Sequence, residues 1–262
     1  MQAAYMRALE HPSGSESRGQ STQGAPVQLA CPVTLQKYSG GRLSFVEDKI
    51  AVESDMRLQI NGQHHAILSR TPGDDLNLVA GYMFSCSMIR EPEDMKNISF
   101  SYHGAAKVDV TLATPRSVRR LYPSPCPMHL DPERIFEFKE TFERRQNLFK
   151  NTGSTHAAAL FSAEGELIAF GEDVGRHNAF DKAVGRALLE GTLGQVAIAM
   201  LSSRLGLELT TKASNANIPI LCGFSAATSC AVNYAERYNI TLVGRIRNGA
   251  FYVYSNGWRL RK

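Results

Sequence analysis

The second half of the chain is organised around residues 151–182, NTGSTHAAALFSAEGELIAFGEDVGRHNAFDK. Two apolar runs in it, residues 157–161 and 167–170, predict β-strands, and Glu164-Gly165 predicts the turn between them. One polar group precedes the first strand and another follows the second. Because a hairpin brings its outer ends together, we expect both polar groups to lie at one edge of a sheet.

The two polar groups contain side chains that are typical of catalytic and binding sites. They read TGSTH at residues 152–156 and EDVGRHN at residues 172–178. The run Arg176–Asp181 predicts the start of a helix, where free backbone amides beside an arginine favour an anion. Solvated turns are the alternative interpretation, because polar residues commonly end strands.

Composition narrows the class of protein. The chain has 262 residues, of which 43% are hydrophobic and 21% charged, as in ordinary globular proteins of one large or two modest domains. No apolar run approaches the ~20 residues of a membrane span. The formal net charge of +4 suits an anionic ligand or an acidic partner protein, but is too small to indicate nucleic acid. We therefore predict neither a membrane nor a nucleic-acid partner.

The N-terminal segment and the cysteines indicate the cellular compartment. Residues 1–25 are rich in Ser, Gly and Gln and lack the apolar centre of a secretory signal, so we expect a flexible tail. The number of cysteines is odd and no Cys-x-x-Cys pair occurs, so we expect free thiols in a reducing cytoplasm and no metal site. The cysteines are Cys31, Cys86, Cys126, Cys222 and Cys230.

The first half of the chain predicts a mixed region of hairpins and one helix. The helix carries apolar residues at core spacing, and Cys86 near its end is expected to be buried. The expected elements are strands over residues 42–52, 56–60 and 64–68, with an Asn61-Gly62 turn between the last two, a helix over 76–88, and a hairpin of 97–102 with 107–113.

Residues 116–130 predict a loop that presents a thiol. Prolines on both sides of Cys126 forbid a helix, so the cysteine should be exposed on a mobile segment. Arginines upstream would increase the thiolate fraction, and His129 could serve as a proton partner. An incidental loop cysteine is the alternative interpretation. The arginines are Arg116, Arg119 and Arg120.

After residue 130 the chain alternates helices and strands, which predicts a parallel or mixed sheet covered on both faces. We expect helices over residues 131–150, 179–190, 202–217 and 229–238, and strands over 196–201, 218–222, 240–246 and 251–254. In such sheets ligands bind where strands end and helices begin. Hydroxyl residues or arginines stand at three of these junctions, residues 176–178, 202–204 and 225–229, which favours phosphate or pyrophosphate, with simple helix capping as the alternative.

Several of these stretches together resemble the FdhD family of formate dehydrogenase accessory sulfurtransferases. They are TGSTHAAALF, GEDVGRHNAFDKAVG, SSRLGLEL, IPILCGFSAATSCAV and ITLVGRIRNGAFYVYS, all between residues 152 and 255, and a fainter likeness includes TPGDDLNLVAGYMFS. The resemblance implies an α/β protein: a three-layer, cytidine-deaminase-like C-terminal domain over residues 131–262 and a smaller mixed α+β N-terminal domain over 31–115. A tail (1–30) and the mobile cysteine loop (116–130) complete the expected organisation, and the resemblance implies a homodimer.

The resemblance also implies a function and a site. The protein would accept persulfide sulfur from a cysteine desulfurase and transfer it to the molybdenum cofactor, in its bis-guanine-dinucleotide form, for formate dehydrogenase. Cys126 would carry the sulfur, assisted by His129, and guanine nucleotides such as GDP would mimic the cofactor. The guanine-dinucleotide pocket falls on Arg245, Ile246, Arg247, Asn248, Gly249 and Ala250. To these we add the anion-binding candidates Thr155, His156, Asp173, Arg176, His177, Asn178, Ser203, Arg204, Ser225, Thr228 and Ser229.

The sequence departs from the family pattern at its cysteine loop. Cys126-Pro127-Met128-His129 has a histidine where the family has a second cysteine, so the loop offers no partner for a resolving disulfide. Milder departures occur at Ser154, Ser203 and Ala227. Two interpretations stay open: a single persulfide is sufficient, or the protein is a non-catalytic chaperone that only binds cofactor. A deaminase-like hydrolase is disfavoured, because the zinc site of that class needs a Cys-x-x-Cys pair.

Overall fold

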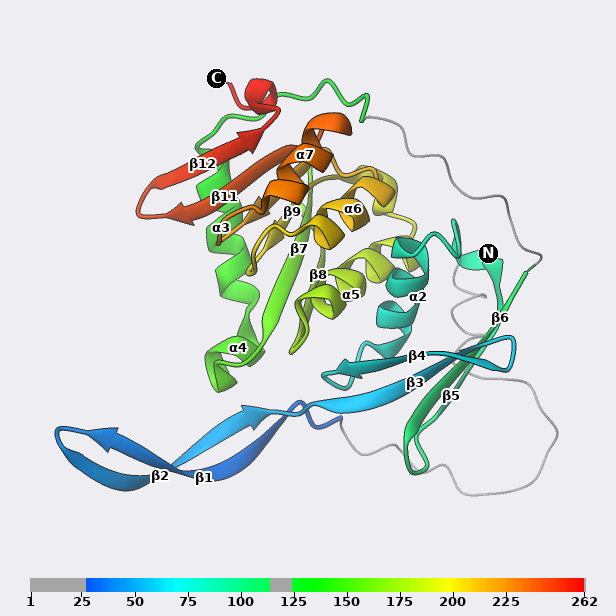
Figure 1. Ribbon diagram of the computed structural model, residues 1–262, viewed down its shortest axis with the longest axis vertical. Coiled ribbons are helices and arrows are strands. Elements are labelled where there is room, and N and C mark those ends of the chain that lie inside the picture. Colours follow the sequence, from blue (N-terminus) through cyan, green and yellow to red (C-terminus); the bar gives the residue numbers. More distant parts are fainter. Residues whose placement is uncertain (1–26, 114–123, 262) are drawn as a thin grey trace.

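The computed structural model describes residues 27–113 and 124–261 (Figure 1). The expected tail over residues 1–25 and the upstream arginines Arg116, Arg119 and Arg120 lie outside the described residues. No helix within the described ranges is both long enough and apolar enough to cross a membrane.

A six-stranded mixed sheet forms the centre of the second half, in the order β12-β11-β10-β9-β7-β8. Strands β9, β10 and β11 run parallel, whereas β7, β8 and β12 are antiparallel to their neighbours. The predicted hairpin and mixed sheet are thus confirmed. The strands are β7 (His156–Ser162), β8 (Leu167–Asp173), β9 (Val196–Leu201), β10 (Ile220–Gly223), β11 (Thr241–Arg247) and β12 (Ala250–Ser255).

Helices cover both faces of this sheet, because both faces of its central strands are apolar (Figure 1). On one face Phe138 and Phe142 of α3 pack against Phe161 and Ile198. The other face is buried beneath α5, α6 and α7. The helices are α3 (Arg134–Arg145), α4 (Asn147–Thr152), α5 (Arg176–Leu189), α6 (Leu207–Asn215) and α7 (Ser229–Arg237), with 3-10 turns η2 (Leu193–Gln195) and η3 (Gly257–Arg259).

The first half forms a four-stranded sheet, in the order β4-β3-β6-β5, that packs on one helix, α2. Helix α2 lies between this sheet and α5, so one hydrophobic cluster runs from the small sheet into the large one (Figure 1). Gly81 and Gly185 allow the two helices to touch, because a Cβ at either position would lie 1.9 Å from a carbonyl oxygen of the other helix. The elements are β3 (Ser54–Ile60), β4 (Gln63–Arg70), α2 (Asp75–Ser85), η1 (Pro92–Asp94), β5 (Met95–Ser101) and β6 (Ala106–Leu112).

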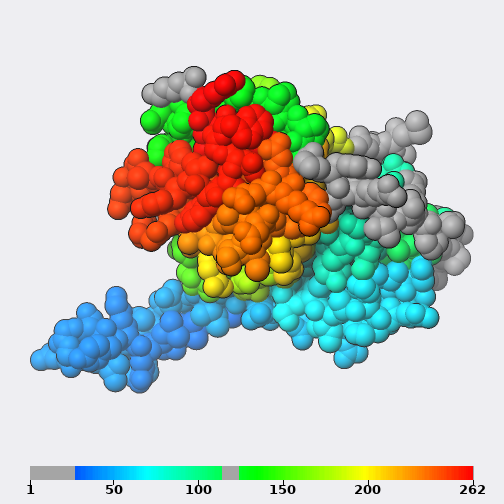
Figure 2. All heavy atoms as spheres, turned by 45° about the horizontal axis from the view of Figure 1, so that its top comes forward, coloured from blue at the N-terminus to red at the C-terminus, as the bar shows by residue number. Residues whose placement is uncertain are grey.

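A two-stranded hairpin, β1 (Ala30–Ser39) with β2 (Arg42–Ala51), projects from the body as an arm (Figures 1 and 2). Its outer half exposes large apolar side chains, with Tyr38 70%, Leu43 65% and Phe45 73% accessible. A hairpin of this kind is at best marginally stable alone in water. The arm therefore presents apolar surface that the described residues of this chain leave uncovered.

Two predicted helices were wrong in their bounds. The single helix over residues 131–150 is two helices, broken at Gln146 (ψ 64°), because the Glu172 carboxylate accepts the backbone N–H groups of Leu148 and Phe149 and starts α4 there. The helix predicted from residue 202 begins only at Leu207. Before it, Leu205 forms a β-bridge with Ala227, which keeps the backbone extended.

Two further predictions for the first half need correction. Cys86, expected to be buried, is exposed at the C-terminal end of α2. Strand β1 was not predicted, because its residues do not alternate clearly between apolar and polar. The hairpin turn at Asn61-Gly62 is confirmed, with both residues in the left-handed region (φ 51° and 77°).

Candidate functional site

The two polar groups of the central hairpin meet at one edge of the six-stranded sheet. His156, which starts β7, pairs in register with Asp173, which ends β8. Ser202 follows β9 at the same edge, and its Oγ lies 3.1 Å from His156 Nδ1 while accepting the Ala157 N–H at 3.0 Å. The carboxyl ends of β9, β10 and β11 therefore share this edge with both histidine-bearing segments. We call it the C-terminal edge.

A second histidine joins the edge from the start of α5. His177 Nε2 lies 3.2 Å from a carboxylate oxygen of Glu208 on α6. The same carboxylate is 3.9 Å from Lys212 Nζ, which in turn binds the buried Asp181 at 2.6 Å. A line of alternating charges thus runs from the open edge into the interface between α5 and α6.

The surroundings of both histidines lower their pKa values and so favour the neutral form. Burial, and next the charge of Arg176, lower the pKa of His156. Burial also lowers the pKa of His177, against the opposing effect of Glu208. Neutral imidazoles can accept a proton from a bound ligand or from water, so the edge offers two proton acceptors at neutral pH.

Arginines and free helix starts make the C-terminal edge suited to an anion. Arg176 is half-buried beside the histidines, and Arg204 is exposed nearby in sequence to Ser202. The N-cap positions of α5 and α6 are glycines, Gly175 and Gly206, with no side-chain cap, so a ligand can reach the first-turn amides. Arginine forks and helix-start amides are the groups that bind phosphate in proteins.

The β11–β12 hairpin carries the remaining arginines of the candidate pocket. Arg245 has a left-handed backbone (φ 54°) at a register shift, and its guanidinium lies 5.1 Å from the ring centroid of Tyr252. The backbone N–H of Arg245 donates to the Ser225 carbonyl at 3.1 Å, which connects this hairpin to the loop after β10. The exposed residues of the turn are Arg245, Arg247, Asn248, Gly249 and Ala250, whereas Ile246 is buried in the core.

Several predicted binding residues already have partners within the fold. Asp173 is buried, bound to Lys182 at 2.8 Å and to the Thr71 N–H at 3.1 Å. Asn178 donates to Asp173 and to the Ser69 carbonyl. Three hydroxyls are similarly engaged: Thr155 with Glu172, Ser203 with the Arg204 carbonyl, and Thr228 as the N-cap of α7. Ser229 is exposed at the start of α7. The engaged residues shape the edge and leave ligand contact to their neighbours.

Sequence reasoning missed two charged residues and misjudged one hydroxyl. Glu208 and Lys212, which pair with His177 and Asp181, are four residues apart on α6, a spacing that brings their side chains together on one helix face. Ser202, rather than Ser203, contacts His156. Only the position of the strand end, which the sequence placed correctly at Leu201, could have pointed to Ser202.

The Cys126 segment lies at the opposite edge of the same sheet. The Ser124 N–H donates to the Tyr238 carbonyl at 3.0 Å, and Leu130 exchanges hydrogen bonds with the backbone of Arg259 and Arg261. Arg259 in turn bonds Thr241, the first residue of β11. The length of β11 therefore separates Cys126 from the C-terminal edge, roughly 20 Å at the rise of a strand.

Cys126 itself is half-exposed and its neighbourhood is cationic. Arg259 Nε donates to the Cys126 carbonyl at 3.3 Å. His129 is exposed, and its Nε2 contacts the Arg261 guanidinium while its ring meets Trp258 edge-on. In the folded chain His129 therefore contacts Trp258 and Arg261, near residue 261.

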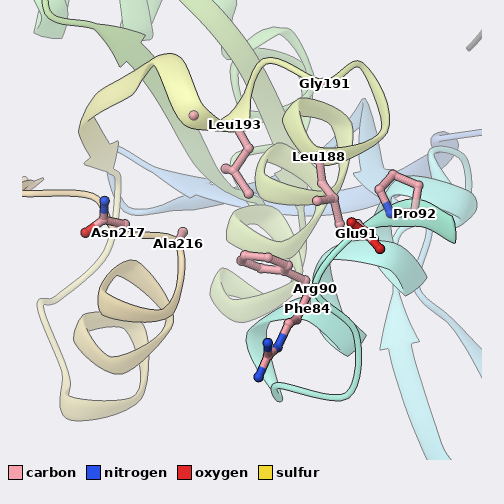
Figure 3. A pocket seen from close by; sticks show the side chains of 10 residues that line it. Phe84, Arg90, Glu91, Pro92, Leu188, Gly191, Leu193, Ala216 and Asn217 are labelled. Atoms are coloured by element: carbon pink, nitrogen blue, oxygen red, sulfur yellow. The ribbon is translucent and has the colours of Figure 1, made fainter. Parts of the chain in front are cut away.

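The pocket in Figure 3 lies away from both segments. Its volume is about 770 Å³, and it lies among the C-terminal ends of α2, α5 and α6, with Phe84, Leu188 and Ala216 among its lining residues (Figure 3). A cleft of about 460 Å³ lies beside β8 and α5, lined in part by Thr71, Glu172 and Lys182. None of the predicted cofactor-binding residues lines either of these two pockets. Within the described ranges, no group of three or more His, Cys, Asp or Glu residues is arranged to hold a metal ion.

A solved structure shares this fold. The chain aligns with a putative formate dehydrogenase accessory protein from Desulfotalea psychrophila with a TM-score of 0.74 and 23% identity, over 89% of this chain and 100% of that one. The class of fold is therefore the mixed α/β fold of that accessory protein.

Sequence comparisons give the family. The FdhD/NarQ family model matches residues 51–127 and 112–261. A sulfur carrier protein FdhD from Sulfurisphaera tokodaii is 36% identical over 82% of this chain and 92% of its own length. Another, from Streptomyces avermitilis, is 34% identical over 84% of this chain and 92% of its own length. The chain belongs to the FdhD/NarQ family.

Proposed function

We propose that the protein is a sulfur carrier that serves formate dehydrogenase, with Cys126 as the carrier thiol. The relatives named sulfur carrier protein FdhD match over most of the chain. The observation that carries the proposal is the half-exposed Cys126, where the motif resemblance puts the family's carrier cysteine, in a proline-bounded segment whose Cys126 carbonyl accepts from the Arg259 guanidinium. A thiol that is open to solvent and next to a cation is the arrangement that nucleophilic cysteines need.

The loading step is a sulfur displacement. The Cys126 thiolate attacks the terminal sulfur of a persulfide on a cysteine desulfurase, a new S–S bond forms on Cys126, and the donor cysteine leaves as a thiolate. The reaction exchanges one S–S bond for another, so it needs no external oxidant or reductant. The protein acts here as a sulfurtransferase.

The acceptor that we propose is the molybdenum cofactor in its bis-guanine-dinucleotide form, bound at the C-terminal edge. The pyrophosphates would meet Arg176, Arg204 and Arg247 and the uncapped helix starts at Gly175 and Gly206. Guanine nucleotides such as GDP carry the same diphosphate and should bind there. The neutral histidines would hold or take up protons as the anionic ligand arrives.

Delivery has to join two opposite edges of the sheet. We propose that residues 124–129 detach from η3 when the sulfur is handed over, while Leu130 stays in the core. Leu130 is buried in the core and anchors the end of this segment, while the residues before it are held by a few hydrogen bonds, among them those of Ser124 and Cys126. Since a hydrogen bond contributes a net ~1 kcal/mol, breaking these bonds costs a few kcal/mol, which a binding partner can offset.

A non-catalytic cofactor chaperone is the second candidate, because His129 stands where the family has its second cysteine. Release of the terminal sulfur as sulfide consumes two electrons, and a neighbouring thiol would supply them by forming a disulfide with Cys126. Without that thiol in the loop, a thiol of another molecule has to supply the two electrons. The chaperone would bind guanine dinucleotide and carry no sulfur.

Complementation separates the two functions. Cells that lack their own sulfur carrier, and whose formate dehydrogenase is inactive, receive this chain or its Cys126→Ala variant. We expect the wild-type chain to restore formate oxidation and the variant to fail. Cys230→Ala, which removes another exposed thiol, is the matched control and should restore activity. Restoration by Cys126→Ala would support the chaperone instead. The expected setting is the cytoplasm, where the thiols stay reduced.

A further inference from the structure

Arg259 is a fully buried cation next to the backbone of Cys126. Its side chain is 0% exposed and stacks on Trp258, with the guanidinium carbon 4.2 Å from the ring centroid. It donates from Nε to the Cys126 carbonyl at 3.3 Å and from Nη1 to Thr241 Oγ1 at 3.2 Å and Asn239 Oδ1 at 3.4 Å. All three acceptors are neutral.

One nitrogen of this guanidinium has nothing to bind. Within the part of the chain that the structure describes, Arg259 Nη2 is buried without a hydrogen-bond partner, and no carboxylate pairs with the side chain. An arginine remains protonated in proteins, and a buried charge without a counter-ion costs several kcal/mol. Such a group is normally paired with an anion, and none of the described residues supplies a hydrogen-bond acceptor to Nη2.

The neighbouring acid is the Cys126 thiol. Burial lowers the pKa of Arg259, and its electrostatic interaction with Cys126 acts in the opposite direction. The thiolate is therefore a charge that this cation can pair with. Another cation near this segment, Arg261, is exposed and contacts His129.

We propose that Arg259 is the positioning residue of the sulfur-carrying thiol, with Nη2 as the donor to the Cys126 thiolate and, after loading, to the anionic terminal sulfur of its persulfide. The terminal sulfur stands about 2 Å beyond Sγ, so a small shift of the segment keeps it within reach of the same donor. The inference rests on the proposed sulfur-carrier function. It adds a chemical role for a residue beyond the candidate pocket.

The test compares alkylation of Cys126 across pH with no sulfur donor present. Wild-type protein, Arg259→Gln, Arg259→Lys and the control Arg261→Gln react with iodoacetamide between pH 5 and 10, and the modified Cys126 peptide is quantified by mass spectrometry. We expect Arg259→Gln to move the midpoint of the Cys126 profile upward by about one unit, a tenfold slower reaction at neutral pH. Arg259→Lys should retain most of the wild-type rate, and Arg261→Gln should leave the midpoint in place.

An unchanged Cys126 midpoint in Arg259→Gln would overturn the inference. Should that variant fail to fold, the wild type decides, because the midpoint of Cys126 in the folded protein must then lie below its midpoint in the same protein unfolded in urea. Equal midpoints would contradict the role. Since alkylation needs neither a desulfurase nor a dehydrogenase, this result is independent of the complementation experiment. A low Cys126 midpoint in a chain that does not complement would count against the carrier function and leave the Arg259 pairing intact.

Discussion

His156 and His177 define the chemistry of the C-terminal edge at the scale of single residues. Each is half-buried, and in each burial is the main cause of a lowered pKa. An anion bound beside them would favour their protonated forms. The edge is thus poised to take up protons when an anionic ligand binds.

The lowered pKa values predict how stability depends on pH. The unfolded chain binds a proton at each histidine near its ordinary pKa of 6.5, whereas the folded protein binds it only at lower pH. Unfolding therefore takes up protons, and the free energy of unfolding should fall as pH decreases below about 6.5. Urea unfolding between pH 5 and 8 measures this slope, and His156→Gln should reduce it. A variant with the wild-type slope would refute the assignment.

The position of Arg176 predicts that its side chain contributes to the binding of a guanine nucleotide. It lies beside both histidines, so replacing it with alanine should weaken GDP binding about tenfold by removing a charged hydrogen bond. Arg186→Ala, at the other end of α5 and paired with Asp74, is the matched control and should bind GDP normally. Titration calorimetry measures both, and equal affinities would place the diphosphate elsewhere.

At this scale the sequence identified the edge but not every contact. His156, Arg176 and His177 were predicted from the hairpin alone, because strand pairing fixes which ends meet. The contacts of Glu208 and Lys212 depend on how α6 packs against α5, and tertiary packing of that kind has no local sequence signal. Ser202 reaches His156 because β9 ends beside the start of β7.

Among the elements, the crossing of α2 and α5 joins the two sheets. The helices approach so closely at Gly81 and Gly185 that a side chain has no room. Helix α5 begins with the site residues Arg176 and His177, so the crossing also fixes the position of the site. The glycines were visible in the sequence, but the partner helix was not.

Gly81→Ala tests the importance of this crossing. The added methyl would meet the Asp181 carbonyl oxygen, so the helices must separate, which should lower the free energy of unfolding by about 1–3 kcal/mol or more. Gly194→Ala, where the added methyl would meet no atom within 4 Å, should leave stability within about 0.5 kcal/mol of wild type. Chemical denaturation gives both values. Equal stabilities would show that α2 is free to shift.

A predicted helix had the wrong bounds where a side chain distant in the sequence binds the backbone. The break at Gln146 follows from Glu172, which binds the first amides of α4 from a distant strand. The apolar spacing of residues 135–149 is compatible with one continuous helix, so no local signal predicted the break.

At the scale of the whole molecule, the outer half of the β1–β2 arm is apolar surface that no other described part of the chain covers. Tyr38 and Leu43 form one cross-strand pair and Phe45 faces the same side, while Leu35 and Val46 face the other. An arm with apolar residues on both faces is typical of a segment that packs between two surfaces. The homodimer that the family resemblance implies would supply such surfaces.

The exposed apolar residues of the arm therefore predict that the protein is a dimer. Light scattering should give twice the mass of one chain for the wild type, and Tyr38→Ser with Phe45→Ser should shift the protein toward monomer by removing apolar contact area. Ile67→Ser, at an exposed position on β4, is the control and should remain dimeric. A double variant that stays fully dimeric would exclude the arm from the interface.

Sequence patterns predicted the mixed sheet and its hairpin from periodicity and turns, and the family from its motifs. They placed Cys126 on a loop but gave no indication of where that loop docks, because the contacts come from η3 and the start of β11 at the end of the chain. The distance between Cys126 and the C-terminal edge is known only from the folded chain.

The proposed role of Cys126 as the sulfur carrier can be tested on the full chain. Incubation with a cysteine desulfurase and cysteine, followed by trapping and peptide mass spectrometry, locates any persulfide directly. We expect the mass of one added sulfur on the Cys126 peptide and none in Cys126→Ala. Sulfur found on Cys86 or Cys230 instead, with Cys126 unmodified, would contradict the proposal.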